Sequence, residues 1–268
     1  ANSASKVVMI EVLDNRAYAR SFAAVQLLLN DSDASVRRAA YNALAQVARS
    51  KDLSVLISLL NNNRSEERKA VKQAIMNVVN YSSDNNREVN SVLNYYQGLN
   101  EDQQINSVDI LSGIGGEKAL QVVAQSIHSN NINLKNAAVL AIANWKDESA
   151  LQNLITLSRT TQDVKQFDAV LRGLIRITSA ANITDERKVL IYRDTMEVAR
   201  TVSQRTLILK KIEENKTYNA LIFAGTFLDD KDLQKTAAVT VMNIALDNIN
   251  YNGNEVKKLL IKVLGLLG

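Results

Sequence analysis

The chain has 268 residues, a net charge of +4 and a pI of about 9.1, and it contains neither cysteine nor proline. The lack of cysteine excludes disulfides, thiolate catalysis, cysteine-ligated zinc and iron–sulfur clusters, and the single histidine argues against a catalytic triad or a histidine-rich metal site. No uninterrupted apolar segment is long enough for a membrane-spanning helix, and the lysines and arginines are interspersed with acidic residues.

Two kinds of helix are expected to alternate along the chain. The first kind is rich in leucine and other large apolar residues, and it is expected at 22–30, 53–61, 88–97, 117–127, 149–159, 186–200 and 218–228. The second kind has one apolar or small-residue face, and it is expected at 34–48, 67–79, 103–114, 134–145, 164–177, 202–212 and 233–245. A last helix is expected at 255–267, which packs inward unless the natural protein continues beyond Gly268.

The segment 34–48 shows the pattern of the second kind most clearly. Val36, Ala40, Leu44 and Val47 follow one another at helical spacing and form an apolar stripe. One helix pair cannot bury such a stripe alone, so successive pairs must stack into a continuous core. The sequence therefore predicts an all-α repeat fold of about seven to eight helical pairs, in one domain over residues 1–268 that is either whole or part of a longer protein.

The segment "LLLNDSDASVRRAAYNAL" (27–44) resembles the HEAT repeat, in which a short turn after Asn-Asp leads into a second helix that opens with Val-Arg and an Ala pair. In this pattern Asp33 is expected to cap the second helix. Arg37 is expected to reach an Asp of an adjacent turn. The resemblance implies a right-handed α-α superhelix of HEAT or armadillo type, and repeat signatures of this kind specify a fold far more than a function.

The segment 193–241 resembles HEAT regions of large secreted proteins from Bacteroidetes and Planctomycetes, which often neighbour a 3-keto-disaccharide hydrolase-type domain. This resemblance covers about a fifth of the chain. It implies a secreted or periplasmic setting and a fragment of a longer protein, and a cytoplasmic setting stays open.

Several motifs that look like chemical sites are better explained by structure. His128 is expected at a helix C-terminus, where an imidazolium complements the helix dipole. "GIGGEKAL" (113–120) lacks the Lys-Ser/Thr of a phosphate-binding loop and is expected to be a turn into a helix. Asp31 and Asp33 have the spacing that opens a calcium loop, but the later Gly and Glu are missing. Trp145, the single tryptophan, is expected to be buried in the core or between repeats. No catalytic, metal or cofactor-binding residue is predicted.

Polar residues of the second helices are the candidates for partner binding, because these helices usually line the concave face of a HEAT array. Asp109 and Asp168 interrupt this set, so a solvated surface is a second explanation. The candidate residues are Arg38, Asn42, Lys72, Arg172, Arg176, Arg205, Lys210 and Lys235.

We expect a non-catalytic scaffold that presents a concave surface to a protein partner or to a neighbouring domain, with no cofactor. One alternative is a nucleic-acid binder or an enzyme on the same scaffold, such as a DNA glycosylase or a bilin-lyase-like protein. Nucleic acid is disfavoured because a glycosylase needs a basic groove with aligned aromatic residues, and aromatic residues make up only 5% of this chain. Another alternative is a mechanical spacer in a secreted sugar-active enzyme.

Overall fold

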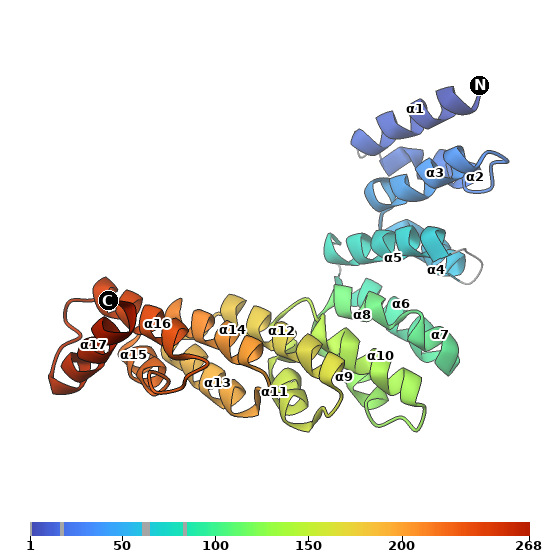
Figure 1. The fold of residues 1–268 in the computed structure, drawn as a ribbon. Helices are drawn as coiled ribbons and strands as arrows, with labels where there is room; N and C mark the ends of the chain where they lie inside the picture. Colours follow the sequence, from blue (N-terminus) through green and yellow to red (C-terminus); the bar gives the residue numbers. More distant parts are fainter. Residues whose placement is uncertain (1, 17–18, 61–64, 83–84) are drawn as a thin grey trace. The chain divides into compact units, whose positions relative to one another are not determined.

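A computed structural model describes residues 2–16, 19–60, 65–82 and 85–268 of the protein, and the described residues form helices and turns with no β-strand (Figure 1). The chain divides into two compact units, residues 1–141 and 142–268, which are described separately below. Among the described residues, no helix is both long enough and apolar enough to cross a membrane. The prediction of a single domain over residues 1–268 stays a prediction.

The first unit is a stack of helix pairs preceded by a single helix. Helix α3 packs against α1 on one side and α5 on the other, and α5 packs in turn against α8. The shorter helices α2 and α4 lie against α3 and α5 respectively. The helices of this unit are α1 (Ser3–Asn15), η1 (Ala19–Ser21), α2 (Phe22–Leu28), α3 (Ala34–Val47), η2 (Ser50–Asp52), α4 (Leu53–Leu59), α5 (Ser65–Asn80), α6 (Asn85–Gln97), α7 (Glu101–Ile105), α8 (Val108–Ile114), α9 (Glu117–Ser126) and α10 (Ile132–Ala143), whose last two residues belong to the second unit.

Helix α3 forms where the apolar stripe predicts it. Val36, Ala40, Leu44 and Val47 are all fully buried, in a helix that packs against α1, α2 and α5. Asp33 caps the helix as predicted, with its Oδ1 2.8 Å from the Ser35 backbone nitrogen. Hydrophobic burial on one face and a satisfied N-terminus together account for this element.

Two features of the first unit differ from expectation. The helix predicted at 103–114 is broken into α7 and α8, because the Asn106 side chain donates to the Asp102 carbonyl (2.8 Å) and Ser107 leaves helical backbone geometry. Side chains of this type compete with the helix for backbone groups. Helix α1 was not indicated by the alternating pattern, since Val8, Met9 and Val12 are exposed and leave it without a clear apolar face.

The second unit is a further stack, which closes with α17. Helix α12 packs on α11, α14 on α13 and α16 on α15, and α16 also contacts both α14 and α17. In chain order the described residues thus contain seven helix pairs, α2/α3 to α15/α16, within the predicted seven to eight. The helices of this unit are η3 (Glu148–Ala150), α11 (Leu151–Thr160), α12 (Val164–Ala180), α13 (Asp185–Val198), α14 (Val202–Glu213), α15 (Tyr218–Gly225), α16 (Gln234–Asp247) and α17 (Asn254–Leu267).

The last helix packs inward, as expected, through buried Val256 and Val263. Its Ile261 and Leu264 remain exposed. Two of the leucine-rich helices end slightly earlier than predicted, because α2 stops at Leu28 and α4 at Leu59. The predicted end of the latter at Asn61 lies outside the described residues.

Candidate functional site

An open groove of 670 Å³ lies between the N-terminal halves of α3 and α5, the second helices of two successive pairs. Its position brings two predicted partner-binding residues, Arg38 and Asn42, to one concave surface within the first unit. The groove is lined by Ala34, Arg37, Arg38, Tyr41, Asn42, Ser65, Glu66 and Glu67.

The register of α3 explains how the groove is built. Arg38 and Asn42 are four residues apart, so both side chains lie on one face of the helix, outside the buried stripe. Tyr41 also lines the groove and is 4% exposed, so most of its ring is packed into the protein. Aromatic residues are enriched in protein interfaces relative to the rest of the surface.

Arg37 lines the groove but is held by its own structure. Its Nη1 lies 2.7 Å from the Asp31 carbonyl oxygen and 3.0 Å from that of Ser32, and its Nε lies 4.0 Å from a carboxylate oxygen of Glu67. Arg37 therefore reaches an Asp of the adjacent turn as expected, through the backbone carbonyl of Asp31. A side chain in the first turn of a helix points back toward the helix N-terminus, where the carbonyls of the preceding turn lie.

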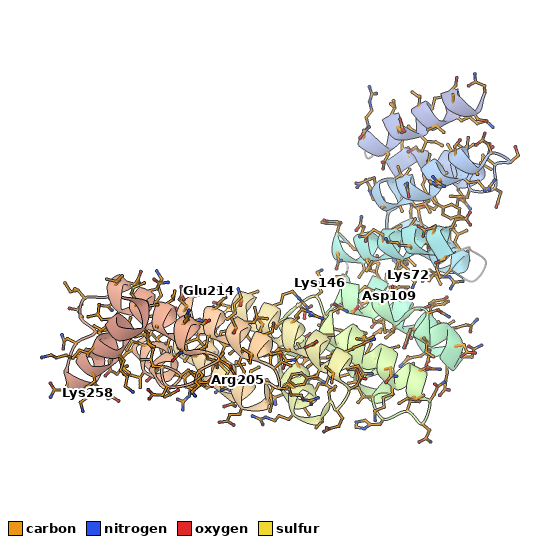
Figure 2. All side chains as sticks on the ribbon, viewed as in Figure 1. Lys72, Asp109, Lys146, Arg205, Glu214 and Lys258 are labelled. Carbon is orange, nitrogen blue, oxygen red and sulfur yellow. The ribbon has the colours of Figure 1, made fainter. Side chains whose placement is uncertain are left out.

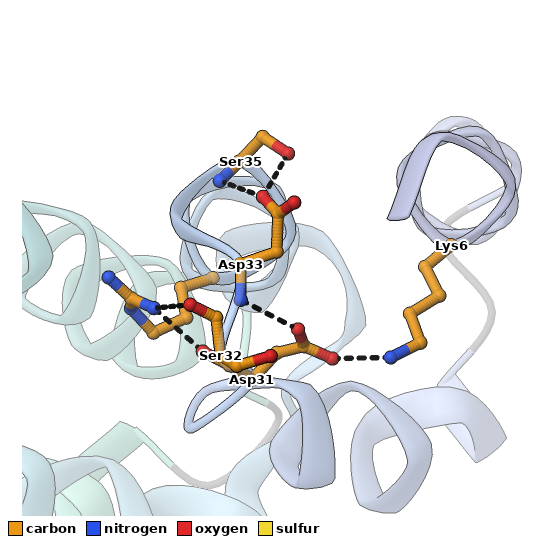
Figure 3. Close-up of polar contacts among 6 residues, drawn as sticks. Lys6, Asp31, Ser32, Asp33 and Ser35 are labelled. Atoms are coloured by element: carbon orange, nitrogen blue, oxygen red, sulfur yellow. Dashed lines mark hydrogen bonds and ion pairs between the residues drawn. The ribbon is translucent and has the colours of Figure 1, made fainter. Parts of the chain in front are cut away.

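The turn before α3 is fixed by a network of polar contacts (Figure 3). Lys6 of α1 donates to Asp31 (2.6 Å), and the same carboxylate accepts the Asp33 backbone N–H (2.9 Å). Asp33 accepts both the N–H and the hydroxyl of Ser35, at 2.8 and 2.6 Å. These contacts use the two aspartates as turn and cap residues, which is the structural explanation preferred over a calcium loop.

The same contacts stabilise both carboxylates in their charged form. The hydrogen bond from the Ser35 hydroxyl is the largest cause that lowers the pKa of Asp33 from 3.8 to about 2. The hydrogen bond from the Lys6 ammonium is the largest cause that lowers the pKa of Asp31. Both groups are therefore anionic at neutral pH and unsuited to proton transfer there.

Three side chains at the groove are available to a partner. Arg38, Asn42 and Glu66 are exposed, and within the described part of the chain none of their side-chain polar atoms has a hydrogen-bond or ion-pair partner. The groove thus offers a guanidinium, an amide and a carboxylate beside a packed aromatic ring.

Three other predicted residues are committed to neighbouring helices. Lys72 lies 2.8 Å from Asp109, and Figure 2 shows the two side chains beside each other. Arg205, also labelled there, lies 3.1 Å from Asp230. Arg176 donates to two backbone carbonyl oxygens of the preceding repeat, including that of Trp145 at 2.8 Å. Their cationic groups thus connect successive repeats, while Arg176 is exposed and Lys72 and Arg205 are partly buried, and their role in partner binding stays a prediction.

Arg172, Lys210 and Lys235 are exposed on α12, α14 and α16. They belong to the second unit, whereas Arg38, Asn42 and Lys72 belong to the first. The structure therefore brings together only Arg38 and Asn42 of the eight predicted residues in one described concavity.

The remaining motifs have structural roles. His128 is exposed just after the end of α9. Gly116 has a φ of +79° and is the N-cap residue directly before α9, so "GIGG" forms a turn into a helix as predicted. Trp145 is fully buried, as predicted, and donates to the Ser149 hydroxyl at 3.0 Å. Within the described ranges, no group of three His, Cys, Asp or Glu residues is arranged to hold a metal ion.

The sequence reasoning did not identify Tyr41 or Glu66 as groove residues. Tyr41 follows the Ala pair and could have been found from the helical wheel as the boundary between the buried and the polar face. Glu66 is brought to the groove by the packing of α5 on α3, which no local pattern shows.

Comparison with known proteins identifies the repeat type of the N-terminal part. Residues 1–76 match the family described as HEAT repeats, which confirms the resemblance on those residues and the all-α, HEAT-type solenoid as the fold class. No curated protein matches the chain. The comparisons leave the envelope-protein resemblance of 193–241 unconfirmed.

Three solved structures that are similar to the chain are engineered or designed proteins. An engineered protein is 18% identical with a TM-score of 0.41, over 99% of this chain and 85% of that one. A second engineered protein is 17% identical with a TM-score of 0.24, over 92% and 96%. A chain from a computational design of self-assembling cyclic homo-oligomers is 12% identical with a TM-score of 0.16, over 99% and 95%.

Proposed function

We propose that the protein is a non-catalytic repeat scaffold that binds a protein partner, or an adjacent domain of its own polypeptide, through the groove between α3 and α5. The observation that carries this proposal is the set of three exposed polar side chains, Arg38, Asn42 and Glu66, around the packed ring of Tyr41. HEAT-type arrays offer extended surfaces of this kind, and their specificity lies in residues that stacking does not constrain.

The charges at the groove favour a protein over a nucleic acid. Glu66 and Glu67 line the same groove as Arg37 and Arg38, so carboxylates stand where a phosphate backbone would approach. A protein surface can present both signs of charge, whereas a nucleic acid presents a dense row of negative phosphates.

The experiment places a photo-crosslinking amino acid at position 42 of the full chain and identifies the cross-linked protein by mass spectrometry. We expect one defined protein to be captured, and we expect Arg38→Glu to abolish the capture. The matched control is Lys51→Glu, which reverses an exposed charge of the same unit away from the groove.

Capture that is equal for the Arg38→Glu variant and the unmodified protein contradicts the proposal, as does the absence of any defined product. Arg38 is exposed and without an internal partner among the described residues, so this variant is expected to retain the circular dichroism spectrum and melting temperature of the original chain.

A further inference from the structure

A second pocket, of 570 Å³, lies in the other unit, where α13, the start of α14 and the end of α15 meet. It contains three arginines, Arg193, Arg200 and Arg205, and two phenylalanines, Phe223 and Phe227. None of these residues except Arg205 was a candidate from sequence, and none lines the groove between α3 and α5.

The two phenylalanines form a rigid apolar floor. Their ring centroids are 5.2 Å apart at an interplanar angle of 86°, which is the edge-to-face geometry that aromatic pairs prefer. Both rings are partly buried and pack against the core of this unit. A guanidinium lies over each ring, and the parts of the rings that remain exposed can contact an aromatic or aliphatic side chain at little cost in conformational entropy, because the rings are already held in place.

The three arginines differ in whether their guanidinium groups already have partners within the protein. Arg200 stacks on the Phe167 ring, 4.2 Å from its centroid, and donates to two backbone carbonyls of the turn before α12, including that of Gln162 at 2.9 Å. Arg205 forms its ion pair with Asp230, and its guanidinium lies 5.6 Å from the centroid of the Phe227 ring. These two guanidiniums therefore hold the turns of the repeats in place.

Arg193 is the third arginine of the pocket. Its guanidinium lies 5.3 Å from the centroid of the Phe223 ring, and within the described residues it has no hydrogen-bond or ion-pair partner. A guanidinium over an aromatic face keeps its N–H groups free at its edge, where they can bind a carboxylate in bidentate fashion.

The remaining charges in the pocket distinguish between ligands. Glu197 and Asp232 are exposed carboxylates that also line it. They repel a polyanion such as single-stranded nucleic acid, but they can accept the backbone N–H groups of a peptide. One unpaired guanidinium beside an apolar floor thus suits a single carboxylate next to a single apolar side chain.

We propose that this pocket binds a peptide segment in which an Asp or Glu lies within two residues of an aromatic or large aliphatic side chain, with the carboxylate on Arg193 and the apolar side chain on Phe223 and Phe227. The site is separate from the groove between α3 and α5. A scaffold with both sites holds two different segments, one on each unit.

The test selects phage-displayed random seven-residue peptides on the immobilised full chain. We expect enrichment of segments with the stated acidic and apolar pair. The enriched peptide is then synthesised with a fluorescent label, and its affinity is measured by fluorescence anisotropy. Because a charge-assisted hydrogen bond to a carboxylate is lost, Arg193→Gln should weaken binding about ten-fold.

Three variants make the result specific. Arg187→Gln removes the same charge from an exposed position of α13 outside the pocket, and it should leave the affinity unchanged. Arg193→Lys keeps the charge but loses the planar fork, and it should bind with intermediate affinity. Arg38→Glu should leave this peptide's affinity unchanged, which separates failure here from failure of the proposed groove.

Four results overturn the proposal. They are no enrichment above a blank surface, enrichment of peptides without a carboxylate, equal affinity in Arg193→Gln, and tight binding of a labelled oligothymidylate that Arg193→Gln abolishes. The last result assigns the pocket to nucleic acid instead. Because Arg193 is exposed, its replacement by Gln is expected to leave the helical circular dichroism spectrum intact.

Discussion

The close approach of two backbone segments at Gly173 makes Gly173→Ala a sharp test of the packing in the second unit. A Cβ at this position would lie 2.2 Å from the Ala143 carbonyl oxygen and 3.0 Å from its carbonyl carbon. Both are backbone atoms, so relief requires α12 to move away by about 1 Å to reach ordinary contact distance. The same Ala143 carbonyl accepts a hydrogen bond from Arg176 at 3.2 Å, so the movement also disturbs the contact between these repeats.

The magnitude follows from three effects. Overpacking of a core costs about 1–3 kcal/mol. The disturbed hydrogen bond from a charged donor costs about 1.5 kcal/mol. Alanine gains about 0.5–1 kcal/mol over glycine inside a helix. We therefore expect Gly173→Ala to lower the free energy of unfolding by about 2 kcal/mol or more.

The assay is urea unfolding followed by the fluorescence of Trp145, which is the single tryptophan and is fully buried in the same unit. The matched control is Gly265→Ala in α17, where an added Cβ meets nothing within 4 Å. That variant should be stabilised by about 0.5–1 kcal/mol, as expected for glycine replaced by alanine in a helix. If Gly173→Ala is as stable as the original chain, the reasoning about close approach is refuted.

Three further predictions concern polar groups. Gln204→Ala should lower the free energy of unfolding by about 2 kcal/mol in the same urea assay. The buried amide of Gln204 accepts hydrogen bonds from two backbone N–H groups before α14 and donates one to Asp168. A smaller loss would show that water replaces these hydrogen bonds. The pKa of Asp33 is about 2 in the folded protein, compared with 3.8 for an unperturbed aspartate. The contribution of this carboxylate to stability is therefore complete above about pH 4 and is lost as the pH falls toward 2. In thermal melts from pH 6 to 2, the difference in melting temperature between the original chain and Asp33→Asn should therefore shrink as the pH falls. A difference that stays constant over this range would contradict the assignment. Trp145→Phe should lower the free energy of unfolding by about 2 kcal/mol, measured by circular dichroism in urea. The smaller ring leaves a gap in the core, and the Ser149 hydroxyl loses the N–H group that donates to it. A loss below about 0.5 kcal/mol would indicate that the side chains around the site repack.

Local patterns were sufficient for most of the helix pairs and for the cap of α3. The stripe from Val36 to Val47 is buried as predicted, and Asp33 caps α3, because helical periodicity and capping depend on residues a few positions apart. The break at Asn106 was missed because an apolar spacing can continue across a point where side chains compete for the backbone.

The candidate site was only partly predictable. Arg38 and Asn42 share a groove, but Glu66 joins them only because α5 packs on α3. The pocket of Arg193 could not be foreseen, because its floor comes from α15 while its free guanidinium comes from α13. Helical periodicity says which face of a helix is polar, but it says nothing of which polar residues on different helices meet.

The sequence by itself determined the repeat architecture, since each helix pair carries an apolar face that only stacking can bury. The tertiary structure decided which cations remain available. Lys72 meets Asp109 at a separation of 37 residues, and Arg176 reaches the Trp145 carbonyl at a separation of 31. Such contacts join residues one repeat apart in the chain, so no local sequence pattern describes them. They show which cations hold repeats together and which, like Arg38 and Arg193, have no hydrogen-bond or ion-pair partner among the described residues and can bind a partner.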